Sequence, residues 1–347
     1  MAQPALDIEV GGRSVRVSSP DRVVFRDVGA TKGDVARYYA AVGERLLAAI
    51  GERPTTLERW PKGVGQGMTL GDDGFYSKRL PKGAPSWVES VEITFPSGRT
   101  ALEVCPTELA VAVWAAQMGT ITFHPWPVMR GHVDHPDQLR LDFDPSPGTH
   151  FEDAVTGALM ARDLCAELGW RSFAKTSGGR GVHVFVPLAP RWDFVEVRHA
   201  VIALARELER RRGDLLTTAW WKEERGARVF VDFNQAARDR TMASAYSLRA
   251  RPEATVSMPV AWEDLANVHP GDFTIATVPG LLALPDPWRG MTAEGFDLAP
   301  ALEMWRLDEE AGLGDLPYPP DYPKMPGEPL RVQPSRRARP EAASETQ

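Results

Sequence analysis

The stretch LRLDFDP, residues 139–145, places Asp142 and Asp144 two apart in an otherwise apolar run. The run predicts a buried strand, and because successive side chains of a strand point to opposite faces, both carboxylates emerge on the same face. Carboxylates in such a place need a basic side chain, a hydrogen-bond network or a metal ion as partner. Taken alone, however, a D-x-D pattern is more typical of a turn or a solvated face.

A third aspartate, Asp232, ends another apolar run, VFVDF. The continuous apolar, β-branched character of this run is typical of a strand buried in a parallel sheet. If its strand neighbours the one that carries Asp142 and Asp144, three carboxylates converge at one end of a sheet. Such a group suits two hard divalent cations, Mg²⁺ or Mn²⁺, because both prefer oxygen ligands.

The stretch KTSGGRGVHVFVPL contains a glycine-rich turn at residues 178–181. We expect its backbone N–H groups to be free, which makes a concavity that accepts phosphate oxygens. Four side chains add donors around the turn: Lys175, Ser177, Arg180 and His183. The alternative is an ordinary hairpin turn with a satisfied histidine. A Walker A loop is absent.

The elements that must position these groups alternate between strands and helices, which indicates an α/β core. A hairpin with a two-residue turn is predicted at Gly11 and Gly12. Residues 62–86 are rich in Gly, Lys and Pro and predict a surface loop. Helices are predicted over residues 32–52, 107–119, 151–169 and 193–213, strands over 121–126, 139–144 and 227–233, and a strand and turn over 173–188.

The 347 residues are 43% hydrophobic, enough for a substantial core. The net charge of −7 means that an anionic partner has to be held by a local basic patch. Cys105 and Cys165 lack metal-ligand spacing, so we expect core residues in a reducing cytosol and no zinc site. Neither a secretion signal nor an apolar run of membrane-spanning length is recognised, which predicts a cytoplasmic protein without a membrane partner.

The sequence after residue 310 is rich in proline and poor in apolar residues. Such a composition cannot support a packed core of its own. We therefore predict a catalytic domain over residues 1–310 and an extended or disordered tail over residues 311–347.

The motifs also occur in a telling order: D-x-D, then S-G-G-x-G-x-H, then a single aspartate after an apolar strand. This order resembles the three motifs of the archaeo-eukaryotic primase superfamily. More closely, the chain is similar to the polymerase module of bacterial ligase D and to stand-alone polymerases related to it. The similarity runs from about residue 18 to about residue 290 and is carried by LERWPKGV, FYSKRLPKGAPSWV, ITFHPW, LRLDFDP, TSGGRGVHV and VFVDFNQAARDRTMASAYSLRARP.

The resemblance implies a primase-polymerase core, in which helices flank a central mixed or antiparallel sheet. It also implies a template-dependent nucleotidyltransferase of DNA repair, which fills short gaps or break ends with NTPs or dNTPs and often prefers ribonucleotides. Two ions of Mg²⁺ or Mn²⁺ would serve the reaction, and a separate DNA ligase would seal the product, since no ligase motif is recognised in this sequence.

Residue by residue, the family pattern implies four groups. Asp142, Asp144 and Asp232 match the catalytic metal ligands. The nucleotide-binding matches are His124, Lys175, Ser177, Gly178, Arg180, His183, Arg240 and Arg249. Arg22 and Lys32 match a pair that holds a 5′-phosphate, and Arg59, Phe75, Tyr76 and Lys78 match template-binding positions. Tyr76 stands where the family often has phenylalanine, and Arg22 and Arg240 stand where it frequently has lysine, which alters donor geometry.

Several alternatives remain open at this point. Carboxylate pairs serve a metal-dependent nuclease equally well, and an inactive scaffold that binds DNA breaks would need none of them. His124 could be a packing residue, and the basic loop around Phe75 and Tyr76 could simply be solvated. Trp220 and Trp221 fit either a contact loop or the core, and the basic SRRAR segment near the end fits either weak phosphate binding or plain solvation.

Overall fold

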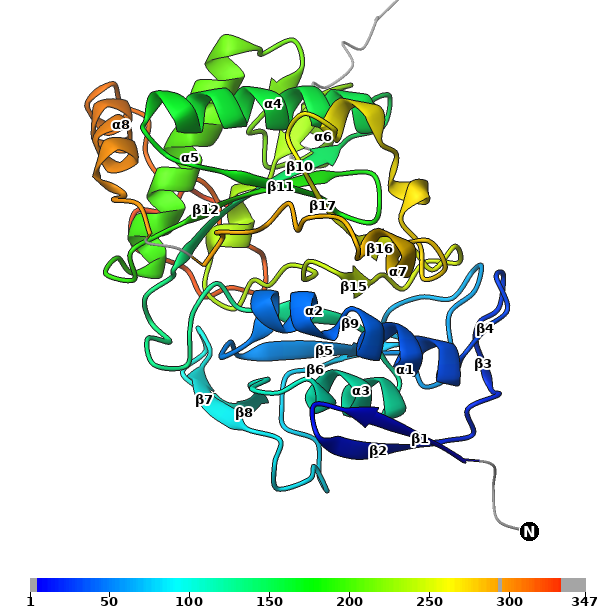
Figure 1. The fold of residues 1–347 in the computed structure, drawn as a ribbon. Helices are drawn as coiled ribbons and strands as arrows, with labels where there is room; N and C mark the ends of the chain where they lie inside the picture. Colours follow the sequence, from blue (N-terminus) through cyan, green and yellow to red (C-terminus); the bar gives the residue numbers. More distant parts are fainter. Residues whose placement is uncertain (1–4, 293–294, 332–347) are drawn as a thin grey trace, which may run out of the picture.

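The computed structural model describes residues 5–292 and 295–331, and in it two sheets carry separate sets of helices (Figure 1). A six-stranded sheet with α4, α5 and α8 forms the upper half of the view, and a five-stranded sheet with α1, α2 and α3 forms the lower half. The predicted α/β class with a mixed, largely antiparallel sheet flanked by helices is confirmed. The sequence did not predict that a second sheet would face the first.

The six-stranded sheet contains the strands on which the three aspartates were predicted. Its order is β13 (Leu216–Thr217), β14 (Val229–Val231), β10 (Gln138–Pro145), β12 (Val182–Pro187), β11 (Phe173–Thr176) and β17 (Pro259–Val260). Only β13 and β14 are parallel. The prediction of a parallel environment for VFVDF is therefore right on one edge and wrong on the other, where β14 runs antiparallel to β10.

Helices α4 (Phe151–Glu167) and α5 (Phe194–Arg211) pack on this sheet and on each other, and α8 (Ala299–Glu310) packs on α5. Gly157 lets α4 approach β10 closely, because a Cβ there would lie 2.8 Å from the ring of Phe143. Asp193 caps α5 by accepting hydrogen bonds from the N–H groups of Val195 and Glu196, at 2.8 and 2.9 Å. These contacts fix the strand that carries Asp142 and Asp144 from behind.

The five-stranded sheet is built around β5. Its strands are β5 (Thr55–Arg59), β6 (Phe75–Ser77), β7 (Ser90–Thr94), β8 (Thr100–Val104) and β9 (Thr120–Pro125). Strand β6 is the only regular element within residues 62–86, so the prediction of a mostly irregular surface segment is confirmed. Helix α3 (Ala110–Gln117) packs against β9.

The single helix predicted over residues 32–52 is wrong, because two helices stand there: α1 (Lys32–Ala41) and α2 (Gly43–Ile50). Val42 separates them with a non-helical ψ of 1°. Gly43, a poor helix former, follows it, and a Cβ at this position would lie 3.4 Å from the side chain of Leu109. The break lets both short helices bury apolar side chains, among them Tyr38, Tyr39 and Leu46.

Short elements complete the chain. The predicted N-terminal hairpin is confirmed as β1 (Ala5–Val10) and β2 (Arg13–Ser18). The others are β3 (Val23–Phe25), β4 (Ala30–Thr31), β15 (Ser247–Leu248), β16 (Val256–Ser257), α6 (Lys222–Arg225), α7 (Val278–Leu281) and the 3₁₀ turns Phe233–Ala236, Leu265–Asn267 and Pro270–Asp272. Both cysteines are buried and free. Within residues 5–292 and 295–331, none of the helices has the length and apolarity that a membrane crossing requires.

Residues 312–331, which we call the strap, contain neither helix nor strand. The strap has no core of its own and packs on the six-stranded half instead. Arg198 of α5, fully buried, lies 3.9 Å below the ring of Tyr318 and donates hydrogen bonds to the carbonyls of Leu316 and Pro317. The SRRAR segment lies outside the described residues.

Candidate functional site

The three aspartates converge as the sequence predicts. Asp142 and Asp144 lie on β10, and the N–H of Asp232, just after β14, donates to the carbonyl of Asp142 at 2.8 Å. One carboxylate oxygen from each residue lies within 4.8 Å of the others. The group therefore offers three oxygen ligands to a metal ion at the end of neighbouring strands. Asp142 and Asp144 share a face because they are two residues apart on one strand, and Asp232 joins them from the next strand.

The surroundings of Asp142 and Asp144 disfavour the ionised form of both carboxylates. Burial and the charge of Asp232 raise the pKa of Asp142 to about 7, and the charge of Asp142, together with burial, raises the pKa of Asp144 to about 8. Asp142 is only 6% exposed, and among the described residues its Oδ1 accepts no hydrogen bond. His183 Nε2 lies 3.3 Å from this Oδ1. A divalent cation would relieve the repulsion between the carboxylates and give Oδ1 a direct ligand contact, so the donor set fits a hard metal ion.

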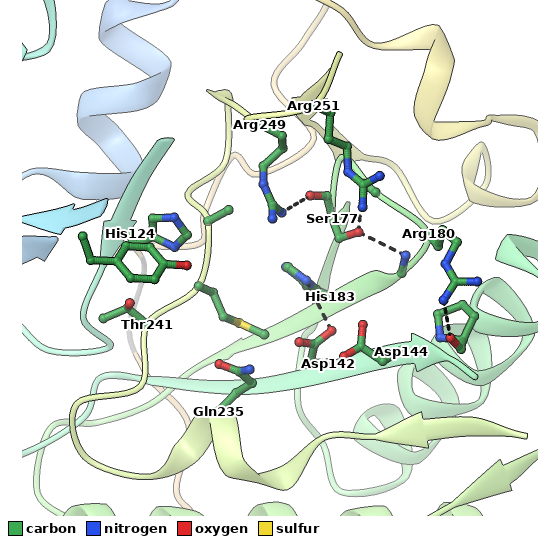
Figure 2. A pocket seen from close by; sticks show the side chains of 16 residues that line it. His124, Asp142, Asp144, Ser177, Arg180, His183, Gln235, Thr241, Arg249 and Arg251 are labelled. Atoms are coloured by element: carbon green, nitrogen blue, oxygen red, sulfur yellow. Dashed lines mark hydrogen bonds and ion pairs between the residues drawn. The ribbon is translucent and has the colours of Figure 1, made fainter. Parts of the chain in front are cut away.

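Asp142 and Asp144 line a pocket of about 360 Å³ between the two sheets (Figure 2), whereas Asp232 is not among its lining residues. Eight of the predicted site residues line it: Tyr76, His124, Asp142, Asp144, Ser177, Arg180, His183 and Arg249. The pocket thus has an acidic floor on β10 and a basic wall opposite. That combination suits an anion that is bound next to a metal ion.

The glycine-rich turn supports the basic wall, but not with free amides. The N–H groups of Gly179 and Gly181 donate to Ser177 Oγ at 3.1 and 3.0 Å, so the prediction of free amides is wrong at these two positions. Gly178 adopts a φ of +68° and sits so close to Arg249 that a Cβ would lie 2.6 Å from its Cγ. The turn therefore presents the Ser177 hydroxyl in a fixed orientation rather than a concave set of free N–H groups.

Three guanidinium groups surround this turn. Arg180 donates to the carbonyl of Pro145 at 3.0 Å, Arg249 donates to the carbonyl of Ser177, and Arg251 lies against Gly179. Figure 2 shows Arg249 and Arg251 side by side above Ser177. Arg251 was not predicted, although it lies two residues after Arg249 in YSLRARP and could have been found from that spacing.

Lys175 lies behind the wall rather than in the pocket. Its Nζ is 2.6 Å from His183 Nδ1 and donates to Ser257 Oγ, also at 2.6 Å. Burial lowers the pKa of Lys175 well below its usual value and does the same for His183. His183 Nε2 then faces Asp142 Oδ1 at 3.3 Å. The lysine therefore orients the histidine and does not reach the pocket itself.

His124 is held by an acidic partner that the sequence did not reveal. Its Nε2 lies 2.7 Å from Oε2 of Glu58 on β5, and Trp60 Nε1 donates to the other oxygen at 2.8 Å. Burial lowers the pKa of His124, against the opposing effect of Glu58. The ring of Tyr76 packs edge-on against His124 with centroids 5.3 Å apart. These partners all belong to the five-stranded half, and His124 shares the pocket with Asp142 and Asp144 of the six-stranded half.

The predicted template residues lie on β6 and beside it. Phe75 and Tyr76 are 44% and 47% exposed. Arg59 lies 5.3 Å from the ring centroid of Phe75, and it donates two hydrogen bonds to the carbonyl of Met118. Lys78 forms an ion pair with Asp239 at 2.7 Å.

The predicted 5′-phosphate pair is brought together on the side of β3 and α1. The N–H of Lys32 donates to the carbonyl of Arg22 at 2.8 Å, and Arg22 donates to the carbonyl of Pro61 at 2.5 Å. Burial, together with the charge of Arg22, lowers the pKa of Lys32 to about 8. Neither residue lines the pocket of the aspartates.

Arg240, predicted to bind the nucleotide, turns away from the pocket. Its Nη2 pairs with Asp321 of the strap at 2.5 Å. Gln235 and Thr241, which were not predicted, line the pocket on this side, and Gln235 donates to Asp232 Oδ2 at 3.2 Å. Their polar side chains follow the third aspartate in sequence, which is the only signal that could have identified them.

Comparison with known proteins agrees with this geometry. The family model described as LigD, primase-polymerase domain, matches residues 31–288. The chain is 32% identical over 258 residues to the multifunctional non-homologous end joining protein LigD of Mycolicibacterium smegmatis, covering 73% of this chain and 32% of that protein. It is 31% identical over 279 residues to the LigD of Pseudomonas aeruginosa, covering 79% and 32%. The chain thus spans about a third of the length of these relatives.

A solved structure shares the fold. It is described as the polymerase domain from Mycobacterium tuberculosis ligase D in complex with DNA, and it superposes with a TM-score of 0.72 at 29% identity, covering 81% of this chain and 99% of that one. The match extends the sequence resemblance to the three-dimensional arrangement of both halves. The chain belongs to the family of LigD primase-polymerase domains, and it is therefore an enzyme of the nucleotidyltransferase class.

Proposed function

We propose that this enzyme is a template-directed primase-polymerase of DNA repair, which fills short gaps and break ends by adding nucleotides to a primer 3′-OH. The observation that carries the proposal is the group of three carboxylates within 4.8 Å beside a pocket walled by Arg180, Arg249 and Arg251. Phosphoryl transfer requires an acidic metal site and a basic clamp side by side. The solved polymerase domain that shares the fold is in complex with DNA, which supports a DNA substrate for this chain as well.

Asp142, Asp144 and Asp232 would hold two divalent cations, Mg²⁺ or Mn²⁺. Bound there, such ions would lower the pKa of the primer hydroxyl and neutralise charge on the α-phosphate. The unsatisfied Oδ1 of Asp142 supports this ligand role.

The protein's own part in the reaction is to bind and orient the triphosphate. Ser177 Oγ, fixed by two backbone N–H groups, can donate its hydroxyl proton outward to a phosphate oxygen. The guanidinium groups of Arg249 and Arg251 can pair with the β- and γ-phosphates, where negative charge grows as pyrophosphate leaves. His183 is held in a fixed orientation between Lys175 and Asp142 and can contact the same phosphates.

Recognition of the template is assigned to the lower half. A base can stack on the exposed ring of Phe75, and Lys78 and Arg79 lie close enough in sequence to neutralise the phosphates beside it. Arg22 and Lys32 would hold a 5′-phosphate across a gap. The same proposal includes a preference for ribonucleotides and a cytoplasmic location. It also includes a DNA ligase that seals the product, and the similarity to end-joining proteins supports a role in the joining of broken DNA ends.

The test is primer extension on a gapped duplex with a downstream 5′-phosphate, offered rNTPs or dNTPs with Mg²⁺ or Mn²⁺. The control is the double variant Asp142→Ala/Asp144→Ala. We expect template-directed growth, stronger with rNTPs, by the wild type alone. Shortening of the primer would identify a nuclease, and retention of the DNA without any extension would identify a scaffold, so either result would overturn the proposal.

A further inference from the structure

A second groove, of about 370 Å³, lies next to the candidate site and is rich in basic residues. Five of the side chains that line it are cationic: Lys78, Arg79, Arg99, Arg238 and Arg240. Its two acidic residues, Asp239 and Asp321, pair with Lys78 and Arg240, and Arg238 pairs with Asp134, which does not line the groove. Arg79 and Arg99 have no ion pair among the described residues. On a chain with a net charge of −7, such an excess of positive charge marks a local binding surface for an anion.

The groove continues the candidate site. The segment of residues 76–79 contributes Tyr76 to the first pocket and Lys78 to the groove, and the segment of residues 238–243 contributes Arg240 to the groove and Thr241 to the first pocket. The ion pair between Lys78 and Asp239 ties these two segments together. A DNA strand that leaves the candidate site past Tyr76 would therefore enter the groove directly.

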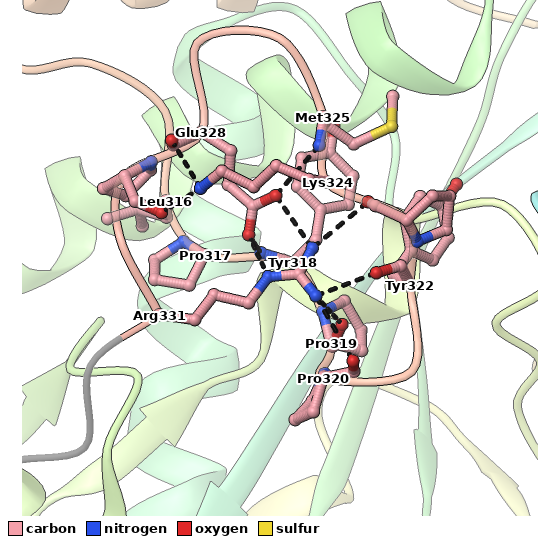
Figure 3. A network of polar contacts seen from close by, with 12 residues as sticks. Leu316, Pro317, Tyr318, Pro319, Pro320, Tyr322, Lys324, Met325, Glu328 and Arg331 are labelled. Atoms are coloured by element: carbon pink, nitrogen blue, oxygen red, sulfur yellow. Dashed lines mark hydrogen bonds and ion pairs between the residues drawn. The ribbon is translucent and has the colours of Figure 1, made fainter.

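The strap supplies one edge of this groove, through Asp321, Tyr322 and Pro323. It lies beyond residues 31–288, which the family model covers. Figure 3 shows how the strap is folded on itself: Arg331 pairs with the buried Glu328 and donates to the carbonyls of Pro319 and Tyr322 at 2.9 and 2.8 Å. Arg198 and Arg206 of α5 hold it to the six-stranded half by donating to the carbonyls of Leu316, Pro317 and Gly314, and none of these contacts involves the side chain of Asp321.

Asp321 itself is weakly held. Its side chain is 76% exposed, and its ion pair with Arg240 Nη2 is of the surface kind, which contributes little to stability. The Nε of Arg240 is buried, and among the described residues it has no hydrogen-bond partner. A phosphate accepts hydrogen bonds from Nε and Nη2 of one arginine at once, so it satisfies a donor that Asp321 leaves unused.

We propose that this groove binds the phosphodiester backbone of the DNA strand that leaves the candidate site, and that Asp321 competes with a DNA phosphate for Arg240. The inference rests on the proposed function, because that function supplies the DNA strand. The strap then acts as a removable anionic cover, which keeps Arg240 paired until DNA replaces the carboxylate. Arg240 is accordingly a ligand of DNA rather than of the incoming nucleotide.

The test measures binding of a fluorescent primer-template with a single-stranded template overhang by anisotropy, at several salt concentrations and without nucleotide or metal. The variants are Asp321→Asn, Arg240→Gln and the double variant. The matched control is Asp214→Asn, which removes the same charge from another exposed pair, that with Arg212 outside the groove. Thermal unfolding of each variant checks that the fold is unchanged.

We expect Asp321→Asn to bind about two- to fivefold more tightly than wild type, because it frees one cation from a surface ion pair. The slope of log K against log salt should steepen by about 0.7, the value for one further phosphate contact on a single strand. Arg240→Gln should bind more weakly, and the double variant should match Arg240→Gln. Asp214→Asn should behave as wild type.

Three results would overturn the inference: unchanged affinity and slope in Asp321→Asn, the same gain in Asp214→Asn, or a gain that persists when Arg240 is absent. Primer extension by the same preparations separates this failure from failure of the proposed function. If wild type extends primers while Asp321→Asn binds as wild type does, only the groove is wrong. If Asp321→Asn binds more tightly and no protein extends a primer, only the polymerase proposal is wrong.

Discussion

The two halves of the molecule present different groups to a ligand. The six-stranded half buries like charges against one another, so that the pKa of Asp142 rises to about 7 and Lys175 is fully enclosed. The five-stranded half leaves Phe75 and Tyr76 about half exposed. In the six-stranded half the carboxylates repel one another, and a bound cation would relieve that repulsion. In the five-stranded half the exposed aromatic rings offer a surface on which a base can stack. The difference leads us to predict that chemistry and stacking on the template base are divided between the two sheets.

The substitution Asp142→Asn tests this division most directly. We expect primer extension to fall by about a hundredfold or more, because a metal ligand contributes several kcal/mol to stabilisation of the transition state. Affinity for the primer-template in the absence of metal should stay within about twofold of wild type. Extension rates and anisotropy measure the two quantities. A variant that lost both together would show that the six-stranded half also carries recognition.

The converse change is Phe75→Ala. It should weaken template binding by about 1–3 kcal/mol, the range for one base stacked on an aromatic ring. The rate at saturating DNA should be close to that of wild type, since no metal ligand is altered. Titration of template in the extension assay separates the two effects. A lower maximal rate at unchanged affinity would contradict the division.

A smaller effect is expected at Lys32. Because burial and Arg22 lower its pKa to about 8, the side chain loses its charge as pH rises from 7 to 9. The preference for gaps with a 5′-phosphate should therefore fall severalfold over this range, and Lys32→Met should show little preference at any pH. Competition binding between phosphorylated and unphosphorylated gapped DNA at each pH measures this preference. A preference that did not vary with pH in wild type would place the phosphate elsewhere.

The smallest expected effect is on stability. In the unfolded chain Asp142 and Asp144 ionise near pH 4, while in the native state their pKa values are about 7 and about 8. Between these values the native state binds more protons, so stability falls as pH rises from 4 to 8. At pH 8 without metal, Asp142→Asn/Asp144→Asn should melt about 2–4 °C above wild type, a difference of about 1 kcal/mol.

Added Mg²⁺ or Mn²⁺ should close this gap by raising the melting temperature of wild type alone. Calorimetry at pH 5 and pH 8, with and without metal, checks both statements. Equal melting temperatures at pH 8 would mean that the carboxylates are less strained than their surroundings indicate.

The sequence predicts the acidic group well, since side-chain alternation along a strand places Asp142 and Asp144 together and neighbouring strands add Asp232. It fails where partners come from distant segments. Glu58 meets His124 through the pairing of β5 with β9, and Lys175 meets Ser257 across 82 residues. No local pattern encodes such pairs, because each depends on how the strands associate. The break at Val42 was missed because apolar residues at helical spacing continue across it.

Arg198 joins two parts of the chain that are distant in sequence. The same buried guanidinium donates to the side chain of Asn234, two residues after Asp232, and to the strap carbonyls of Leu316 and Pro317. Lifting the strap at Tyr318 would leave a buried charge with half of its acceptors. In hydrogen exchange, the strap near Tyr318 should therefore open together with the turn after Asp232, as one unit of local unfolding.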